Sequence, residues 1–186
     1  LAKGHNFPLL GLVGVVDADL GLAHGDPRAA EKTFQLIQQV TGRAGRAGGE
    51  ARALLQTRAP DHPVLRAIVA GDRDGFYEAE VEERRRSGMP PFGRLVALVV
   101  SAEEREPAFA LARALAQAAP RDPDVTVLGP AEAPIAVVRG RHRFRLLVRT
   151  PRAYDVQAWL RRWLNDAPSP TGSARIQVDV DPQSFL

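Results

Sequence analysis

The 186-residue sequence contains no cysteine, one methionine and only two lysines, Lys3 and Lys32. Without cysteine the chain forms neither disulfides nor thiolate metal sites, which fits a reducing cytoplasm. No apolar run approaches the roughly 20 residues of a membrane-spanning helix, so we expect no membrane partner. The opening residues, LAKGHNFP, include neither an initiator methionine nor the blocks of a signal peptide. We therefore expect a chain that begins inside a longer cytoplasmic protein.

Several catalytic and metal-binding motifs are also missing. Neither lysine follows a glycine, so there is no G-x-x-x-x-G-K-[ST] phosphate loop. There is no H-E-x-x-H motif and no G-x-S-x-G motif. The histidines are scattered, without metal-ligand spacing, at His5, His24, His62 and His142. The sequence therefore predicts no self-contained catalytic centre and no metal site.

The composition is that of a folded protein, but the positive charge is unevenly placed. A hydrophobic share of 45% and a charged share of 25% argue against a disordered tail. Six arginines and no acid occupy residues 139–152, and without them the net charge would be −3 instead of +3. This segment favours nucleic acid or another polyanion as a partner. The alternative is a compositional preference for arginine over lysine, with no functional meaning.

The first part of the sequence has an α/β pattern. The apolar run 9–16 predicts a buried strand, and Asp26-Pro27 is typical of a helix N-cap followed by proline at the first helical position. The buried side of that helix is expected to comprise Phe34, Leu36, Ile37 and Val40. A strand near 53–57 follows, and then a short helix after Pro63. Its inward-facing residues are expected to be Val64, Leu65, Ile68 and Val69.

A charged helix is predicted over 72–87, and the sequence Gly-Met-Pro-Pro at 88–91 ends it. The remaining periodicities give the order β-α-β-β-α-β of a ferredoxin-like α+β domain. The expected strands are 95–100, 125–128 with 135–138, 143–149 and 176–180, and the expected helices are 108–118 and 156–164. Trp159 and Trp163 lie one helical turn apart, so we assign both to the core and not to a base-stacking platform.

The segment QVTGRAGR at 39–46 is the strongest candidate for chemistry. A helix is predicted to end at Gly42, in a loop that carries Arg43 and Arg46. Glycines allow close approach of a ligand to the backbone, and guanidinium groups match phosphate oxygens. Such arginines can stabilise the charge on a transferring γ-phosphoryl group. A helix C-terminus with exposed charge is the alternative, and the spacing alone leaves it open.

This segment resembles the Gln-x-x-Gly-Arg-x-Gly-Arg motif of superfamily-two helicases. Other segments, in the same order along the chain, resemble the PriA family of replication-restart helicases. They are LAKGHNFP at 1–8, DADL at 17–20, DPRAAE at 26–31, ERR at 83–85, PPF at 90–92, LGPA at 128–131, RGRHRF at 139–144 and DVDP at 179–182. The resemblance covers essentially the whole chain.

The resemblance implies an α/β fold with three parts. Residues 1–70 would be part of a RecA-like helicase lobe, 71–89 a charged linker helix, and 90–186 the family's C-terminal DNA- and partner-binding domain. The full-length protein would be an ATP-dependent 3′-to-5′ DNA helicase that restarts stalled replication forks by primosome assembly. The isolated chain is expected to be inactive, because it lacks the lobe that grips the nucleotide. We expect a cytoplasmic, nucleoid-associated protein.

The resemblance also assigns roles to residues of the helicase segment. Gln39, Gly42, Arg43 and Arg46 would line the cleft for ATP with magnesium, with Arg43 and Arg46 as the catalytic arginine fingers. Lys3 and Gly4 would couple the nucleotide site to DNA. Zinc is expected in the full-length protein, but not in this chain.

In the C-terminal domain, Arg141, Arg143 and Arg145 alternate with apolar residues, so a strand would place them on one face. They are expected to contact branched and single-stranded DNA. The family also binds the C-terminal tail of single-stranded-DNA-binding protein through an arginine and a glutamine. Gln157 matches the glutamine, whereas Ala153 occupies the arginine position, so Arg149 or Arg152 would have to substitute. Primosome proteins are further expected partners.

Two other functions are compatible with the sequence. The chain could be a stand-alone nucleic-acid-binding module without a motor, since fold alone does not decide function. It could also be an adaptor that recruits partner proteins through the same basic strand.

Overall fold

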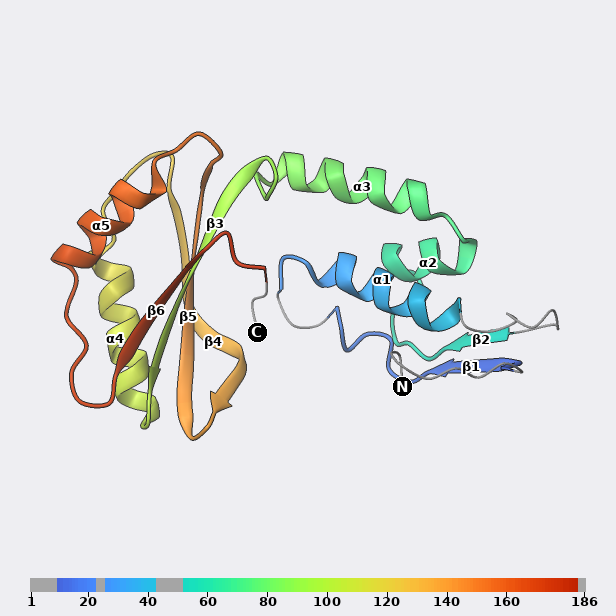
Figure 1. Cartoon of the computed structure of the whole chain (residues 1–186), viewed down its shortest axis with the longest axis horizontal. Coiled ribbons are helices and arrows are strands. Elements are labelled where there is room, and N and C mark those ends of the chain that lie inside the picture. The colour runs from blue at the N-terminus through green and yellow to red at the C-terminus, as the bar shows by residue number, and fades with distance from the viewer. Residues whose placement is uncertain (1–9, 23–25, 43–51, 184–186) are drawn as a thin grey trace. The chain divides into compact units, whose positions relative to one another are not determined.

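The structure is a computed structural model that describes residues 10–22, 26–42 and 52–183 (Figure 1). The chain divides into two compact units, Leu1–Val81 and Glu82–Leu186, which are described separately below. The elements of the first unit, in chain order, are β1 (Leu12–Val15), α1 (Ala29–Thr41), β2 (Arg52–Leu55), α2 (Pro63–Ala70) and most of α3 (Arg73–Arg86). Those of the second unit are β3 (Gly93–Ala102), α4 (Arg105–Ala118), β4 (Thr126–Val138), β5 (Arg141–Pro151), α5 (Val156–Asp166) and β6 (Arg175–Val180).

In the first unit, β1 and β2 form a two-stranded parallel sheet, as expected for an α/β arrangement. β1 is shorter than the predicted strand over 9–16. One face of the pair packs against the helices, where Val15 and Leu55 join a cluster with Ile37 and Leu65. On the other face, Leu12 and Leu54 are 55% and 61% exposed. Because parallel sheets are normally covered on both faces, this uncovered apolar face is unusual.

The start of α1 differs from the prediction. The helix begins at Ala29, with Arg28 and not Asp26 at the N-cap position. Asp26 instead closes a turn before the helix, because its Oδ1 accepts a hydrogen bond from the backbone N–H of Arg28 at 2.9 Å. Its other oxygen, Oδ2, accepts from Lys32 Nζ at 2.8 Å. Pro27 therefore lies in that turn and not at the first helical position.

The buried side of the first two helices is only partly as predicted. Phe34 and Ile37 are buried, but Leu36 is 53% exposed, because two residues along a helix place it about 200° around the axis from Phe34. Thr33 occupies the inward position instead. In α2 the prediction was wrong for Val69, which lies in the last turn and is 79% exposed.

The predicted short helix after Pro63 and the predicted charged helix over 72–87 are both confirmed. His62 is the N-cap of α2, where its Nδ1 accepts a hydrogen bond from the backbone N–H of Val64 at 3.3 Å. Gly71 ends the helix with a φ of +68°, a left-handed conformation that favours glycine. The first turns of α3 bury Phe76, whose ring stacks on Phe34 with centroids 4.1 Å apart.

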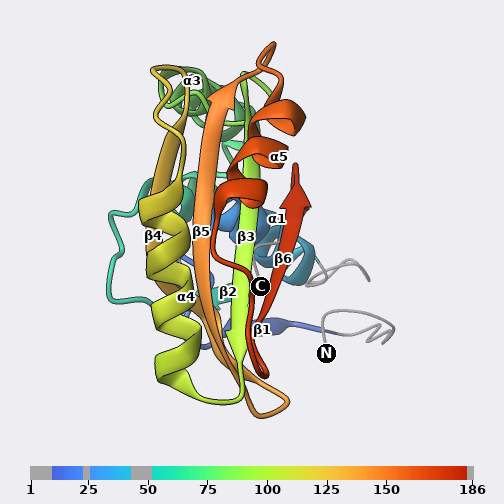
Figure 2. The ribbon, with the colours of Figure 1, turned by 90° about the vertical axis from the view of Figure 1, so that its left-hand side faces the viewer.

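The second unit has the predicted β-α-β-β-α-β order of elements. Its four strands lie in the order β4-β5-β3-β6, and every neighbouring pair is antiparallel. α4 and α5 cover one face of this sheet (Figure 2). β4 runs without a break over residues predicted as two strand pieces, although its register shifts between Leu128 and Ala131, next to the cis Gly129–Pro130 bond.

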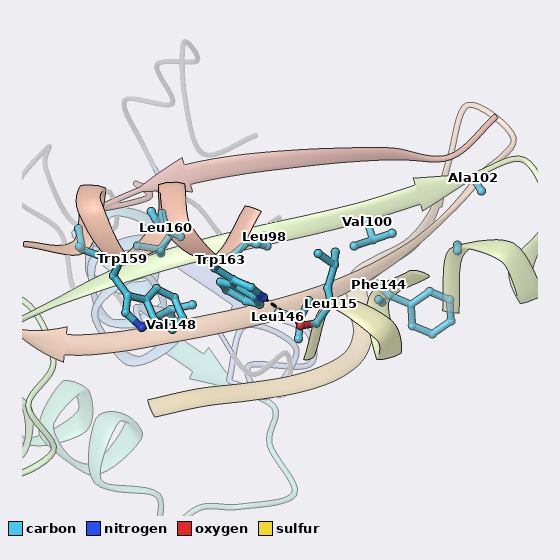
Figure 3. Packing of buried hydrophobic residues seen from close by; sticks show 14 residues of the cluster. Leu98, Val100, Ala102, Leu115, Phe144, Leu146, Val148, Trp159, Leu160 and Trp163 are labelled. Atoms are coloured by element: carbon cyan, nitrogen blue, oxygen red, sulfur yellow. Dashed lines mark hydrogen bonds between the residues drawn. The ribbon is translucent and has the colours of Figure 1, made fainter. Parts of the chain in front are cut away.

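The main core lies between this sheet and its two helices. Alternate residues of the two central strands point into it, namely Val96, Leu98 and Val100 of β3 and Phe144, Leu146 and Val148 of β5. Trp159 and Trp163 of α5 are both part of this core, as predicted (Figure 3). The indole Nε1 of Trp163 donates a hydrogen bond to the carbonyl of Leu115 in α4 at 3.0 Å, which joins the two helices.

A smaller cluster lies on the other face of the same sheet. Leu95 and Ala97 of β3 are buried there, with Leu147 of β5 beside them. Met89, in the segment between α3 and β3, packs over them. Among the residues of the second unit that the structure describes, this cluster does not extend to the other end of the face, toward Ser101.

Candidate nucleic-acid interface

The basic segment forms the β4–β5 hairpin and the whole of β5. Arg139 and Gly140 make a two-residue turn, with φ values of +51° and +74°. Two successive residues with positive φ are typical of the type I′ turn, whose twist matches that of the flanking strands. The pairing of Val138 with Arg141 then sets the register of β5.

This register places the arginines of β5 on the face opposite α4 and α5. Phe144, Leu146 and Val148 point into the core, so the alternating odd-numbered residues point the other way. Across the sheet, Ser101 of β3 lies between Arg143 of β5 and Arg175 of β6. We call this surface the arginine face and define it by five residues: Arg141, Arg143, Arg145, Arg149 and Arg175.

Two of these arginines hold loops in place. Arg141 donates from Nη2 to the carbonyl of Ser101 at 3.1 Å and to the carbonyl of Ser173, so it ties the ends of β3 and β5 to the segment before β6. Arg149 donates from Nη1 to the carbonyl of Ser87 at 2.7 Å, which fixes the segment after α3.

The remaining arginines of the face have different surroundings. Arg143 and Arg145 are half-buried, whereas Arg175 is exposed. Gln177 of β6 is exposed beside Arg175 and, across Val99, lies in the same row as Arg145. Arg175 and Gln177 were missed at the sequence level. The alternation of Arg175, Gln177 and Asp179 with Ile176, Val178 and Val180 was the signal that could have identified them.

The residues assigned to the partner tail do not form one cluster. Arg149 lies on the arginine face, while Gln157 is exposed on α5, which packs on the opposite face of the sheet. Arg152 is exposed in the turn between β5 and α5. Only Arg152 and Gln157 therefore lie near the same end of one helix.

The helicase segment is described only in part. Gln39 is exposed in the last turns of α1, and the helix ends at Gly42. Gly42 has a φ of −65°, a right-handed backbone conformation that residues other than glycine adopt equally well. Arg43, Arg46, Lys3 and Gly4 lie outside the described residues.

Asp19, in the segment after β1, holds the end of the parallel pair together. Its carboxylate accepts hydrogen bonds from the backbone N–H of Arg58 at 2.7 Å and from the hydroxyl of Thr57. These two hydrogen bonds, the first being the larger cause, lower the pKa of Asp19 below its ordinary value. The residues after β1 and β2 are therefore joined by a charged acceptor.

A second charged contact joins two loops of the other unit. Tyr154 Oη donates to Asp122 Oδ2 at 2.6 Å. This hydrogen bond, together with one from the N–H of Asp124, lowers the pKa of Asp122. Burial and the same carboxylate raise the pKa of Tyr154 to about 12.

Replacing Tyr154 by phenylalanine is expected to raise the pKa of Asp122 toward its ordinary value, because the main donor is lost. A carboxyl whose pKa is lowered on folding adds stability above its unfolded pKa, and this stability is lost as the pH falls through its folded pKa. The Tyr154→Phe variant should therefore lose less stability on acidification. Carbon-13 NMR titration of the Asp122 carboxyl measures the shift, with Tyr77→Phe in the first unit as the control. An unchanged Asp122 titration would contradict the assignment.

No group of three histidine, cysteine or acidic side chains in the described part of the chain could hold a metal ion. No helix in those residues is both long and apolar enough to cross a membrane.

Comparison with known protein families gives a match over the second unit. Residues 85–183 match the model of the primosomal protein N C-terminal domain. The chain belongs to this family. The match includes β5, α5 and β6, so the arginine face is part of the family's domain.

The family's curated relatives match beyond this domain. The replication restart protein PriA of Rickettsia felis is 38% identical over 185 residues, which cover 100% of this chain and 28% of the relative. The protein of the same name from Treponema pallidum is 40% identical over 190 residues, with the same coverage of both. That of Bacillus subtilis is 33% identical over 188 residues, covering 100% of this chain and 23% of the relative. The chain thus spans less than a third of the length of these relatives.

Proposed function

We propose that this chain is part of an ATP-dependent 3′-to-5′ DNA helicase that restarts stalled replication forks by primosome assembly. In this proposal the first unit supplies the arginine fingers Arg43 and Arg46, and the second unit supplies contacts to DNA. The observation that carries the proposal is similarity along the whole chain, at 33–40% identity, to proteins named for replication restart. The segment QVTGRAGR, with its helicase-like spacing, lies within that aligned length.

The first unit is proposed to belong to a larger RecA-like lobe. Its parallel strand pair leaves Leu12 and Leu54 exposed, and Val16 just beyond β1 is 81% exposed. Parallel sheets rarely leave an apolar face in water, and relatives more than three times as long offer further chain to cover it. ATP with magnesium would bind between this lobe and a second one, with Gln39 and Gly42 beside the two arginines.

The second unit is proposed to bind branched and single-stranded DNA. Its basic residues gather on one face of the sheet, and four of them come from one strand. A row of guanidinium groups matches the spacing and charge of a phosphate backbone. The C-terminal tail of single-stranded-DNA-binding protein is proposed to bind near Arg152 and Gln157, which are exposed around the start of α5.

The chain alone is expected to hydrolyse no ATP, with or without single-stranded DNA, because it offers no lysine in a phosphate loop. A polypeptide of the relatives' full length is expected to hydrolyse ATP and to be stimulated by DNA. A coupled phosphate-release assay on both proteins tests the proposal. Hydrolysis by the chain alone, or none by the longer protein, would overturn the division of roles.

A stand-alone nucleic-acid-binding module is the second candidate, favoured by the arginine face itself. It differs from the motor in one measurable respect. A module would bind DNA equally well in the presence of ADP and of a non-hydrolysable ATP analogue, whereas a motor of full length changes its DNA affinity with the bound nucleotide.

A further inference from the structure

The arginine face differs in one respect from sheet surfaces that recognise bases. Four-stranded sheets that bind single-stranded RNA carry aromatic residues on their two central strands, and successive bases stack on these rings. The central strands here are β3 and β5. Their residues on the arginine face are Leu95, Ala97, Val99 and Ser101 of β3 and Arg141, Arg143, Arg145, Leu147 and Arg149 of β5. None of these residues is aromatic.

The one aromatic residue of β5 points the other way. Phe144 is 3% exposed and packs in the helix-covered core against Phe109, with ring centroids 5.1 Å apart. The two tryptophans of α5 are also buried in that core (Figure 3). A strand of DNA lying over β3 and β5 would therefore contact charged and apolar side chains, and the described residues of these two strands offer it no aromatic ring on which to stack.

The charges of the face have the layout of a phosphate-binding surface. Arg143 and Arg175 flank Ser101 from the two neighbouring strands, so their Cα atoms lie about 10 Å apart. Arg145 follows two residues further along β5, in the row of Gln177. On β3, β5 and β6 the register places a single acid on this face, Asp179, beside Ala97. Glu103, just after β3, lies 3.9 Å from Nη1 of Arg141.

We propose that the arginine face binds nucleic acid through its phosphates alone, independently of base identity and without base stacking. This inference rests on the proposed DNA-binding role of the second unit and adds the face and the chemical mode. The guanidinium groups of Arg143 and Arg175 contact phosphate oxygens on one backbone, while Arg141 and Arg149 hold the supporting loops and contribute charge.

Two probes test the mode of binding. Fluorescence anisotropy of the complete 186-residue chain is measured with a thymidine 20-mer and with an abasic 20-mer that has the same phosphates and no bases. The affinities are expected to agree within about twofold, because only phosphates are contacted. If stacking occurred, it would add roughly 1–3 kcal/mol for each base. An affinity for the abasic oligomer at least tenfold lower would overturn the phosphate-only mode and leave the DNA-binding role standing.

A pair of matched double variants tests the face. Arg143→Ala with Arg175→Ala removes two charges from it, and Arg113→Ala with Arg121→Ala removes two exposed charges from α4 and the loop after it. Each lost phosphate contact makes the log–log salt dependence shallower by roughly 0.7 for a single strand. For the variant with Arg143→Ala and Arg175→Ala, the slope of log affinity against log salt concentration is therefore expected to become shallower by about 1.4. The slope of the Arg113→Ala and Arg121→Ala control is expected to stay almost unchanged. Circular dichroism verifies that both variants are folded, and Arg143→Lys with Arg175→Lys is expected to keep the wild-type slope.

The outcomes separate this inference from the proposed function. If the slope became equally shallow in both double alanine variants, or only in the α4 variant, the arginine face would not be the binding surface. The proposed DNA-binding role of the second unit would still hold. A wild-type chain that binds neither oligomer at low salt would overturn the DNA-binding role of the second unit, and this inference with it.

Discussion

Replacing Arg46 by alanine in a protein of the relatives' full length is expected to lower DNA-stimulated ATP hydrolysis about a thousandfold. An arginine finger stabilises charge on the transferring phosphoryl group, and its loss costs roughly 10³ or more in turnover. DNA affinity should stay within about twofold of wild type, because the proposed role of Arg46 is to contact the nucleotide and not DNA. Since Arg46 lies outside the described residues, the expectation comes from the resemblance of QVTGRAGR to the helicase motif.

The measurement needs both readouts on the same preparation. ATP turnover is followed at saturating single-stranded DNA, and DNA affinity by anisotropy without nucleotide. Arg58→Ala is a suitable control, because Arg58 is an exposed arginine of the same unit and only its backbone N–H bonds to Asp19. If Arg46→Ala reduced turnover and DNA affinity to the same extent, Arg46 would be structural and not a finger.

The second large effect is expected in the core. Trp163→Ala should destabilise the second unit by about 3–5 kcal/mol, the usual cost of truncating a buried tryptophan. Trp163 is fully buried between α5, α4 and the sheet, and its indole bonds to the Leu115 carbonyl (Figure 3). Urea unfolding of the 186-residue chain, followed by fluorescence of the remaining Trp159, measures the loss. A change below about 1 kcal/mol would contradict the packing.

The two tryptophans also form a matched pair for the hydrogen bond. Trp159 is 2% exposed, and its Nε1 has no hydrogen-bond partner in the described part of the chain. Phenylalanine at either position removes a similar part of the ring system, but only Trp163→Phe also leaves the Leu115 carbonyl without its indole donor. Trp163→Phe should therefore cost about 1 kcal/mol more than Trp159→Phe. Equal costs would show that the hydrogen bond is energetically neutral.

The second unit was predictable because its sequence patterns have a simple physical cause. β5 alternates arginines with core residues, and α5 repeats apolar residues at helical spacing, so each element indicates its own buried side. The order β-α-β-β-α-β and the burial of both tryptophans followed from these patterns. The predicted break in β4 was wrong, because Gly129-Pro130 disturbs the register without ending the strand.

The buried residues of the first unit were predicted less well, because apolar side chains of its helices also lie on exposed faces. Leu36 and Val69 are apolar residues that face away from the small core, and apolar character alone does not distinguish covered from uncovered faces. The helix start at Asp26-Pro27 was misplaced by two residues, since an aspartate can cap a helix or close the turn before it.

The candidate interface was also predictable only in part. The sequence indicated that Arg141, Arg143 and Arg145 share a face, because strand alternation is local. It gave no sign that Arg141 holds the carbonyls of Ser101 and Ser173, which are distant in the chain. Nor could it place Arg175 beside Ser101, because the register between β3 and β6 is set by tertiary pairing.

The central claim is that DNA binds to the arginine face, and amide NMR tests it most directly. Titrating the nitrogen-15-labelled 186-residue chain with a thymidine 20-mer is expected to shift the amides of Ser101, Arg143, Arg145, Arg175 and Gln177 most strongly, and to shift them back as salt is added. Shifts confined to α4 and α5, on the opposite side of the sheet, would contradict the claim.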